Sequence, residues 1–290
     1  MTLRIRWLGR VTYDDAWVLQ RAFFEDRTSG DDWLLLLEHP HVYTVGIRGD
    51  TTNLLVDPAS VGAELVHTDR GGDITYHGPG QLVGYPIVTV PTGPGAISRH
   101  VRSVEQLVID ALGDVGLAGA GRLDGYHGVW VGLDDPSCTP RKIAAVGLRL
   151  SRGRSMHGFA LNVDPELGMF HSIIPCGIAD KAVTSLAAEG VEVAMGDVVD
   201  AVIDRAVRCW GAGAHDGLVR PLPSYAASLV ALARGHGVEP AAGRELVLAG
   251  AATDPEVLSV LADLQAVRRS VDLSRSAATQ QRGSSLRPFW

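Results

Sequence analysis

The stretch from residue 70 to residue 85, RGGDITYHGPGQLVGY, restricts the possible folds of this chain more than any other feature. It holds five glycines and a proline in sixteen positions, a composition that disfavours an ordinary helix or strand. Glycine adopts positive φ and lets the backbone approach a ligand closely. Arg70 and His77 frame the stretch, and Tyr76 adds an aromatic wall. We therefore expect a ligand-contacting loop, although a set of tight turns with glycines for steric reasons is the alternative.

The glycines do not follow the spacing of a nucleotide-binding loop. No GK[ST] follows them, and the GxGxxG spacing is absent, so neither a P-loop nor a dinucleotide fingerprint is indicated. The formal net charge of −7 argues against a broad electrostatic grip on nucleic acid. His39 and His41 form an H-x-H pair with no acidic or cysteine cluster nearby. We therefore expect no metal and no cofactor.

Hydrophobic periodicity predicts a mixture of helices and strands. Helices are expected over 14–27, 98–117 and 197–210, and strands at WLLLLEHP, VYTVGI, QLVGYPIVTV, GVWVGL, KIAAVGLRL and SMHGFALNVD. The elements do not alternate in a steady β-α-β-α order. This favours an α/β (α+β) domain with a mixed sheet flanked by helices over a doubly wound parallel sheet.

The composition changes near residue 215. Residues 1–215 read as one catalytic domain, with 46% apolar and 20% charged residues in the whole chain, as is ordinary for a soluble protein. Residues 216–269 are rich in alanine and leucine and predict a C-terminal helical extension of unknown role. Residues 270–290 are polar, and we expect a disordered tail there.

The lack of a recognisable targeting signal and the cysteine usage predict a cytoplasmic protein. The first residues, MTLRIRWLGR, contain no apolar core of a secretory signal, and the apolar run from Trp33 to Leu37 is too short to cross a bilayer. Cys138, Cys176 and Cys209 lie far apart without a CxxC pair. An odd number of cysteines without a signal peptide predicts reduced thiols in the cytosol.

Cys176 is the strongest candidate for a nucleophile. It lies between Pro175 and Gly177, just before a possible helix start near Ala179. Cysteine reacts as the thiolate, which a helix N-terminus or a nearby cation stabilises. The alternative is a small buried apolar side chain, the usual role of a free cysteine. Cys138, in a polar turn, and Cys209, beside Trp210, are expected to be structural or incidental.

Lys142 is the second reactive candidate. Strict alternation along the strand KIAAVGLRL would place it on the more apolar face, together with Ala144 and Val146. A buried amine is costly unless it is paired or neutralised. The alternative is a lysine that ends the strand and extends to water. An ammonium about 4 Å from a thiolate attracts it by roughly 4 kcal/mol at an effective dielectric near 20, before desolvation is subtracted.

Three sequence blocks together resemble one known family. Arg70-Gly71-Gly72, Thr75-Tyr76-His77, Gln81 and Tyr85 look like the signature of the lipoyl(octanoyl)transferases, LipB. RKIAAVGLRLSRGRSMHGFALNV is similar to that family's second block, and FHSIIPCG, residues 170–177, resembles the third, which holds its nucleophile. The resemblance covers about residues 1–215.

The resemblance implies a fold and an activity. The fold would be that of biotin and lipoate protein ligases. The activity would be transfer of an octanoyl group from octanoyl-acyl carrier protein to a lysine of lipoyl domains, the first step of endogenous protein lipoylation. The acceptors would be the E2 subunits of 2-oxoacid dehydrogenases and the glycine-cleavage H protein. No nucleic acid and no membrane would take part.

The resemblance also implies roles for individual residues. Cys176 would carry the acyl group as a thioester, and Lys142 would be its acid/base partner. The residues expected to line the acyl pocket are Arg70, Gly71, Gly72, Asp73, Ile74, Thr75, Tyr76, His77, Ala145, Val146, Gly147, Gly158, Phe159 and Ala160.

Two other readings of the sequence stay open. The first is an ATP-dependent lipoate- or biotin-protein ligase on the same fold, which would form an adenylate and release pyrophosphate. The missing nucleotide loop weighs against it. The second is a non-catalytic module that binds acylated carrier protein, whose Cys176 would never become acylated.

Overall fold

The computed structural model describes residues 2–26, 30–135, 137–174, 182–211 and 215–219. The chain divides into two compact units, one built from Met1–Tyr13 and Asp31–Arg220 and the other from Asp14–Gly30 and Pro221–Trp290. The described part of the second unit contains one helix, α1 (Tyr13–Glu25). The first residue of α1, Tyr13, belongs to the first unit. Asp14 and Asp15 stand in its first turn, where negative charge favours the helix dipole.

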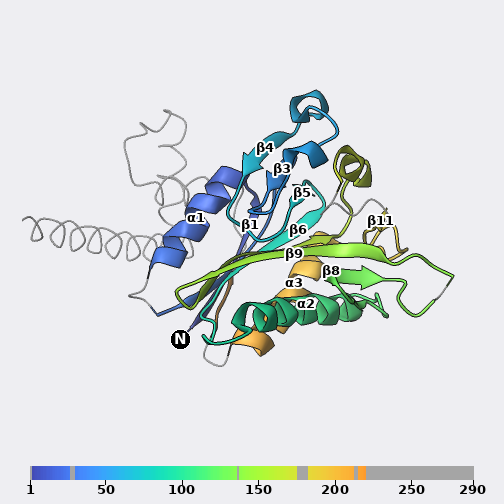
Figure 1. The fold of residues 1–290 in the computed structure, drawn as a ribbon. Helices are drawn as coiled ribbons and strands as arrows, with labels where there is room; N and C mark the ends of the chain where they lie inside the picture. The colour runs from blue at the N-terminus through green and yellow to red at the C-terminus, as the bar shows by residue number, and fades with distance from the viewer. Residues whose placement is uncertain (1, 27–29, 136, 175–181, 212–214, 220–290) are drawn as a thin grey trace, which may run out of the picture. The chain divides into compact units, whose positions relative to one another are not determined.

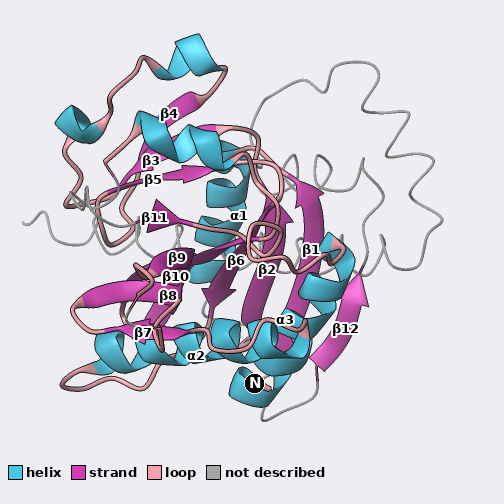
Figure 2. Ribbon diagram, turned by 90° about the vertical axis from the view of Figure 1, so that its right-hand side faces the viewer, coloured by secondary structure: helices cyan, strands magenta, loops and turns pink. Residues whose placement is uncertain are grey.

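The first unit is organised around a sheet of nine strands in the order β12-β1-β2-β6-β10-β9-β8-β7, with β11 paired to β9 (Figures 1 and 2). β1 is parallel to β2 and β12, β11 is parallel to β9, and the other pairs are antiparallel. The sheet is therefore mixed, as predicted. The strands are β1 (Leu3–Arg10), β2 (Asp32–Glu38), β6 (Gln81–Ile87), β7 (Gly121–Leu123), β8 (Tyr126–Val131), β9 (Arg141–Ser151), β10 (Arg154–Asn162), β11 (Ala182–Val183) and β12 (His215–Val219).

The central strands have continuous apolar sequences because they are buried along their whole length. Every residue of β6 and β10 is buried, and in β2 every residue except Glu38 is buried. β2 has four leucines in a row. A half-exposed strand would alternate apolar and polar residues, so this run fits a strand that is covered on both faces.

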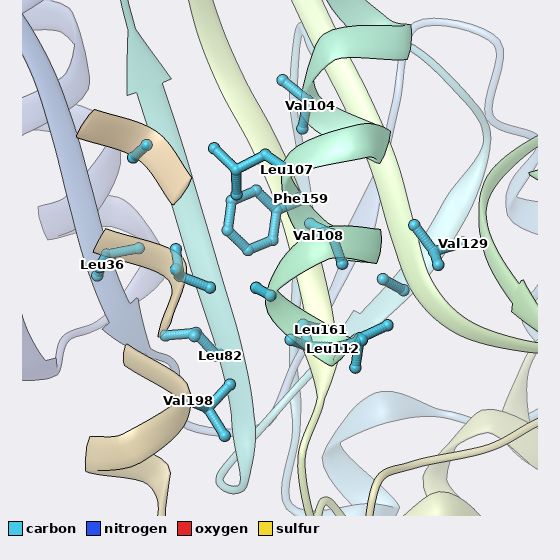
Figure 3. Close-up of a cluster of buried hydrophobic side chains, with 14 of the residues drawn as sticks. Leu36, Leu82, Val104, Leu107, Val108, Leu112, Val129, Phe159, Leu161 and Val198 are labelled. Carbon is cyan, nitrogen blue, oxygen red and sulfur yellow. The ribbon is translucent and has the colours of Figure 1, made fainter. Parts of the chain in front are cut away.

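Helices α2 (Ala96–Asp114) and α3 (Met195–Trp210) pack against each other and against the large sheet (Figures 1 and 2). Apolar residues at helical spacing bring one face of α2 into the core. Figure 3 shows this core, where Phe159 of β10 lies next to Leu107 of α2. The core residues labelled in Figure 3 are Leu36, Leu82, Val104, Leu107, Val108, Leu112, Val129, Phe159, Leu161 and Val198.

A second, smaller sheet has the order β4-β3-β5 and lies away from α2 and α3 (Figures 1 and 2). Its strands are β4 (Glu64–His67), β3 (Val42–Val45) and β5 (Ile74–His77). The short helices η1 (Thr51–Asn53) and η2 (Pro58–Val61) lie between β3 and β4 in the sequence, and η3 (Leu167–Ser172), which follows β10, contacts β5. Tyr43 and Tyr76 pack with Met169 and Phe170 in a separate apolar cluster. The Tyr43 hydroxyl donates to the Met169 carbonyl over 2.9 Å and so fixes η3 to this sheet.

The predicted helices agree with α1, α2 and α3 to within a few residues, and each predicted strand is present. The stretch 70–85 is only partly a loop, because it contains β5 and the start of β6. β4, β7, β11 and β12 were not predicted, since strands of two to five residues carry little period-2 signal. β1 was also missed, although its sequence LRIRWLGR begins with alternating apolar and polar residues. Of the predicted extension, residues 216–219 belong to β12, and the rest of 216–269 and all of 270–290 lie outside the described residues.

No helix in the described part of the chain has the length and hydropathy to cross a bilayer.

Gly158 and Gly113 provide a matched test of strand packing. A Cβ atom at Gly158 would overlap the Gly84 carbonyl oxygen of the neighbouring strand, whereas one at Gly113 of α2 would meet nothing within 4 Å. We expect Gly158→Ala to lower the free energy of unfolding in urea by about 3 kcal/mol. Gly113→Ala should raise it by about 0.5–1 kcal/mol. Equal effects of the two changes would contradict the close approach of β6 and β10.

Candidate active site

The predicted pocket residues, except Tyr76, surround one cavity of about 590 Å³. Three segments converge on it: residues 70–77, residues 145–148 of β9 and residues 157–160 of β10. Its volume falls within the range typical of small-molecule sites, and its lining combines apolar side chains with a few polar groups. The structure thus brings together residues that lie up to ninety positions apart in sequence.

The glycine-rich loop, residues 70–73, is held against β9 by a close backbone contact. The Gly71 amide donates to the Leu148 carbonyl over 3.2 Å. A Cβ at Gly71 would lie 2.8 Å from that oxygen, and a Cβ at Gly147 would lie 2.8 Å from the Gly71 carbonyl oxygen. Such distances are shorter than real Cβ atoms show. Glycine is therefore required on both sides of the contact for steric reasons, and the contact forms one wall of the cavity.

Arg70 is a buried part of this wall. Its Nε donates to the Thr44 hydroxyl over 3.0 Å, its Nη2 to the Thr44 carbonyl over 2.5 Å, and its Nη1 to the Gly71 carbonyl over 3.1 Å. These bonds connect β3 to the glycine-rich loop. The guanidinium also adds a fixed positive charge behind the cavity.

His77 is held in one tautomer by its partners. Gln81 Nε2 must donate to the Tyr76 carbonyl, 3.3 Å away, so Gln81 Oε1 is the acceptor for His77 Nδ1–H at 2.8 Å. His77 Nε2 is therefore the acceptor of the ring and lies 3.4 Å from the Thr44 hydroxyl. Burial lowers the pKa of His77 well below its usual value, and repulsion from the Arg70 guanidinium and from His39, when that ring is protonated, acts in the same direction. The cavity wall thus presents a neutral imidazole.

The same network continues toward Lys142. Gln81 Nε2 also donates to Asn162 Oδ1 over 2.8 Å, and Asn162 Nδ2 donates to the Thr184 carbonyl over 2.8 Å. The Thr184 amide in turn donates to the Lys142 carbonyl over 2.9 Å. β11, which precedes Thr184, is thereby fixed beside the strand that carries Lys142.

Lys142 lines the cavity, with its Nζ 4.7 Å from the centre of the Trp130 ring. An ammonium over an indole face is in a favourable cation–π position. The strict alternation assumed from the sequence does not hold here. The β8–β9 register shifts between the pairs Val129–Ala144 and Trp130–Lys142, and both Ile143 and Ala144 are buried in the same core cluster. A bulge of this kind re-aims the neighbouring side chain.

Cys176 lies outside the residues that the structure describes, so its position relative to Lys142 stays a prediction. The described residues before and after it in sequence include Phe170 and Val183, and both of these line the cavity. Cys138 and Cys209, expected to be incidental, are both exposed, and neither lines the cavity.

Tyr76 and the H-x-H histidines, His39 and His41, support the cavity wall through hydrogen bonds and ring packing. The Tyr76 hydroxyl bonds to His41 Nδ1 over 2.7 Å, and its ring packs edge-on against Phe170 rather than facing the cavity. His39 Nδ1 donates to the Val11 carbonyl over 2.7 Å, and its Nε2 accepts from the Tyr85 hydroxyl over 2.8 Å. Burial lowers the pKa of His39 to about 4. Among the described residues no cluster of potential metal ligands is found.

His157 was not predicted as a site residue. It has a φ of 61°, is buried in the cavity wall, and donates from Nε2 to Asp69 over 2.7 Å. Burial lowers the pKa of His157, while the bond to His157 lowers the pKa of Asp69 to about 2. Asp69 also pairs with Arg149. The signal in the sequence was a histidine beside a strand glycine, SMHGF, in an otherwise apolar stretch.

Other lining residues that sequence reasoning did not commit to come from several elements. Asn162 and Gln81 are polar residues at strand ends, a signal that could have been read. Arg48, in the turn after β3, and Ile97, in the first turn of α2, gave none. The remaining additions are Tyr13, Val83, Tyr85, Val101, Gly125, Tyr126, His127, Leu148, Phe170 and Val183.

Comparison with known proteins shows which sequences are similar to this chain. The sequence pattern of the lipoyl protein ligase A/B catalytic domain matches residues 12–206. An octanoyltransferase of Mycolicibacterium gilvum is 48% identical over 202 residues, which are 69% of this chain and 82% of that protein. An octanoyltransferase of Mycobacterium tuberculosis is 48% identical over 204 residues, 70% of this chain and 84% of the relative.

The chain belongs to the LipB octanoyltransferase family. The family resemblance stated from three sequence blocks is therefore confirmed.

Solved structures agree with this family at the level of the fold. A bi-partite lipoate protein ligase from Thermoplasma acidophilum superposes with a TM-score of 0.60 at 18% identity, over 80% of this chain and 92% of the other. Lipoate-protein ligase A bound with ATP gives 0.60 at 17% identity, over 80% and 95%. The predicted lipoate-ligase-like fold is thus confirmed.

The neutral histidines of the wall predict a pH dependence of stability. His39, His77 and His157 have pKa values lowered from 6.5 in the folded state. Between about pH 6.5 and 4 the unfolded chain therefore binds more protons, so the free energy of unfolding falls as pH is lowered through this window. We expect a slope of up to about 1.4 kcal/mol per pH unit for each histidine in urea titrations. A flat profile between pH 7 and 4.5 would contradict the neutral assignment, because Asp69 contributes only below its unfolded value of 3.8.

Proposed function

We propose that this chain transfers an octanoyl group from octanoyl-acyl carrier protein to a lysine of lipoyl domains, through a thioester on Cys176. The relatives are octanoyltransferases, so the chain is an acyltransferase acting in lipoate metabolism. The archaeal ligase with the same fold was solved in a study of a lipoylation system with its E2 lipoyl domain, which supports lipoyl domains as acceptors. The reduced thiols that such chemistry needs fit a cytoplasmic location.

One observation carries the proposal: Lys142, Phe170 and Val183 border the same cavity as the glycine-rich loop. Phe170 and Val183 stand on either side of Cys176 in the chain, six and seven positions away. Lys142 pairs directly with Val183 in the β9–β11 ladder. A thiol and an amine that act on one acyl chain require this kind of convergence.

The first half-reaction would form the acyl-enzyme. The Cys176 thiolate attacks the thioester carbonyl, the carbonyl electrons move to oxygen, and the intermediate collapses by expelling the carrier thiolate, which takes a proton from the Lys142 ammonium. One thioester is exchanged for another, so no ATP is needed. Covalent catalysis divides the overall transfer into two easier steps.

The second half-reaction would form the amide. The neutral amine of the acceptor lysine attacks the Cys176 thioester, and the Cys176 thiolate leaves. The proton lost by the acceptor nitrogen passes to the neutral Lys142 amine, which restores the ammonium. Lys142 thus returns to its starting state after each turnover, and its charge favours the thiolate form of Cys176 at rest.

The cavity would hold the acyl chain and select its length. Each buried methylene contributes about 0.8 kcal/mol, so an eight-carbon chain gains much of its affinity from apolar contact. Val83, Phe159 and Ala160 supply apolar wall, and Gly147 and Gly158 permit the close backbone contacts from which the wall is built. Backbone amides of the glycine segments are suited to stabilise the oxyanion of each tetrahedral intermediate.

A second function is favoured by one finding, the likeness of fold to lipoate-protein ligase A bound with ATP. A ligase would activate a free fatty or lipoic acid as its adenylate and release pyrophosphate. Incubation of the full chain with octanoate, lipoate or biotin, ATP and a lipoyl domain should release no pyrophosphate if the transferase proposal holds. A carrier-binding module without activity would bind octanoyl carrier but form no acyl-enzyme.

Cys176→Ser is expected to abolish the hydroxylamine-labile octanoyl adduct that forms on incubation with octanoyl-acyl carrier protein. A serine hydroxyl is far less ionised than a thiol at neutral pH, so it cannot replace the nucleophile. Intact-protein mass spectrometry measures the adduct. Cys138→Ser and Cys209→Ser, at exposed cysteines away from the cavity, should leave it unchanged. Transfer at the normal rate by Cys176→Ser would rule out the covalent scheme.

Lys142→Ala is expected to slow acylation about 10²- to 10⁴-fold at pH 7. Without the ammonium the thiol is harder to ionise, so the rate should recover partly as pH rises. Single-turnover acylation across pH 6–10 measures this, and Lys142→Met, which keeps the side-chain stem over Trp130, controls for lost packing. A rate that stays low at every pH would contradict a role limited to tuning the thiol.

A further inference from the structure

A tight turn after β3 stands at the mouth of the cavity. In this turn Ile47 is 70% exposed, and Arg48 is exposed and lines the cavity. An exposed isoleucine next to an exposed arginine combines an apolar and a cationic contact on a single short segment.

The turn is fixed to the cavity wall by its backbone. The Gly46 amide donates to the Asp73 carbonyl over 3.2 Å, the Ile47 amide to the Arg70 carbonyl over 3.0 Å, and the Arg48 amide to the Gly72 carbonyl over 3.1 Å. Its partners are thus the residues of the glycine-rich loop that line the cavity. The backbone of Arg48 is therefore held beside the cavity by these contacts.

The carboxylates that line the cavity or the adjoining depression already have donors. Asp73 accepts from the Asp50 amide at 3.1 Å, the Ile74 amide at 2.7 Å and Asn53 Nδ2 at 2.8 Å. Asp69 accepts from His157 and pairs with Arg149. Neither carboxylate neutralises Arg48.

The other cations that line these surfaces also have partners. Arg70 bonds to Thr44 and Gly71, Lys142 lies over Trp130, and Arg149 pairs with Asp69. Arg48 differs: its guanidinium forms no hydrogen bond and no ion pair with any of the described residues. An exposed cation without a partner at the mouth of an apolar cavity is suited to an anion that arrives with the substrate.

Apolar surface continues outward from the mouth beside Arg48. A shallow depression there is lined by Ile47 and by Ile97, which is 40% exposed, and it shares Gly71, Ile97 and Leu148 with the cavity. A ligand that leaves the cavity by this side therefore meets apolar side chains next to the arginine.

We propose that Arg48 binds the phosphodiester of the donor's pantetheine arm, with Ile47 in contact with the apolar carbon beside that phosphate. The assignment rests on the proposed function, in which the donor is an acyl thioester on a carrier protein. Such a thioester ends a flexible arm whose other end is a phosphodiester, and the carbon next to the phosphate ester's CH2 carries two methyl groups. Arg48, which lines the cavity, and Ile47, which lines the depression beside it, are neighbours in the chain, as the anion and the dimethyl carbon are neighbours on this arm.

The experiment compares three donors in the acylation half-reaction of the full chain, without an acceptor. All three donors carry the pantetheine arm: octanoyl-acyl carrier protein has the phosphate and the protein, octanoyl-coenzyme A has the phosphate without the protein, and octanoyl-pantetheine has neither phosphate nor protein. For Arg48→Ala, the second-order rate constant of acylation with the first two should fall about 10- to 100-fold, through weaker donor binding, while octanoyl-pantetheine is unaffected. Arg48→Lys should recover part of the loss, since lysine keeps the charge without the planar fork.

Arg208→Ala is the matched control, because Arg208 is an exposed arginine on α3 that lines neither the cavity nor the depression. It removes the same charge and should leave all three donors unchanged.

Each other outcome overturns the assignment. Equal loss with all three donors would make Arg48 a structural residue of the mouth. Loss with the carrier alone would mean that it contacts an acidic protein surface instead of the phosphate. No loss with any donor would leave it without a role in donor binding. If the parent chain formed no acyl-enzyme with any donor, the proposed function itself would fail, which separates the two tests.

Discussion

The close approach of Gly71 to Gly147 is the contact on which the rest of the site depends. Without side chains at these positions, the loop after β4 reaches the edge of β9 and bonds to the Leu148 carbonyl. That contact joins the small sheet to the large one and leaves a cavity between the loop and the strands behind it. Arg70 connects the same loop to Thr44 of β3, so the wall is tied at both ends.

The buried side chains behind this wall are neutral polar groups that hydrogen-bond to one another. The chain from Thr44 through His77, Gln81 and Asn162 to the Thr184 carbonyl pairs donors with acceptors in one consistent direction. Buried polar networks specify a unique arrangement when every member is satisfied. Here the last member fixes β11 beside Lys142, so the network orders the backbone next to the site without placing a charge in it.

The sequence was sufficient for most of the fold and much of the cavity, for identifiable reasons. Long periodic segments such as α2 and the leucine run of β2 carry strong signals, and the density of glycines at 70–80 marked the wall. Lys142 shows where the reasoning failed: its orientation depends on a bulge that alternation cannot reveal. The role of Arg48 depends on tertiary contacts alone, and the sequence signal for His157 was a histidine beside a strand glycine. The hydrogen bonds of the two H-x-H histidines to Val11, Tyr85 and Tyr76 could not be predicted from the sequence.

Phe159 belongs at once to the cavity lining and to the main apolar core, where it lies by Leu107 of α2 (Figure 3). Its ring also occupies the space over Gly84 that any other residue there would need. A redesign of this family toward longer or bulkier acyl groups by trimming this ring would hollow out the packing beneath α2 as well. With the cavity as the proposed acyl site, substrate range and thermal tolerance would be coupled through a single aromatic side chain, and laboratory evolution toward new acyl groups should first accumulate compensating changes along that helix.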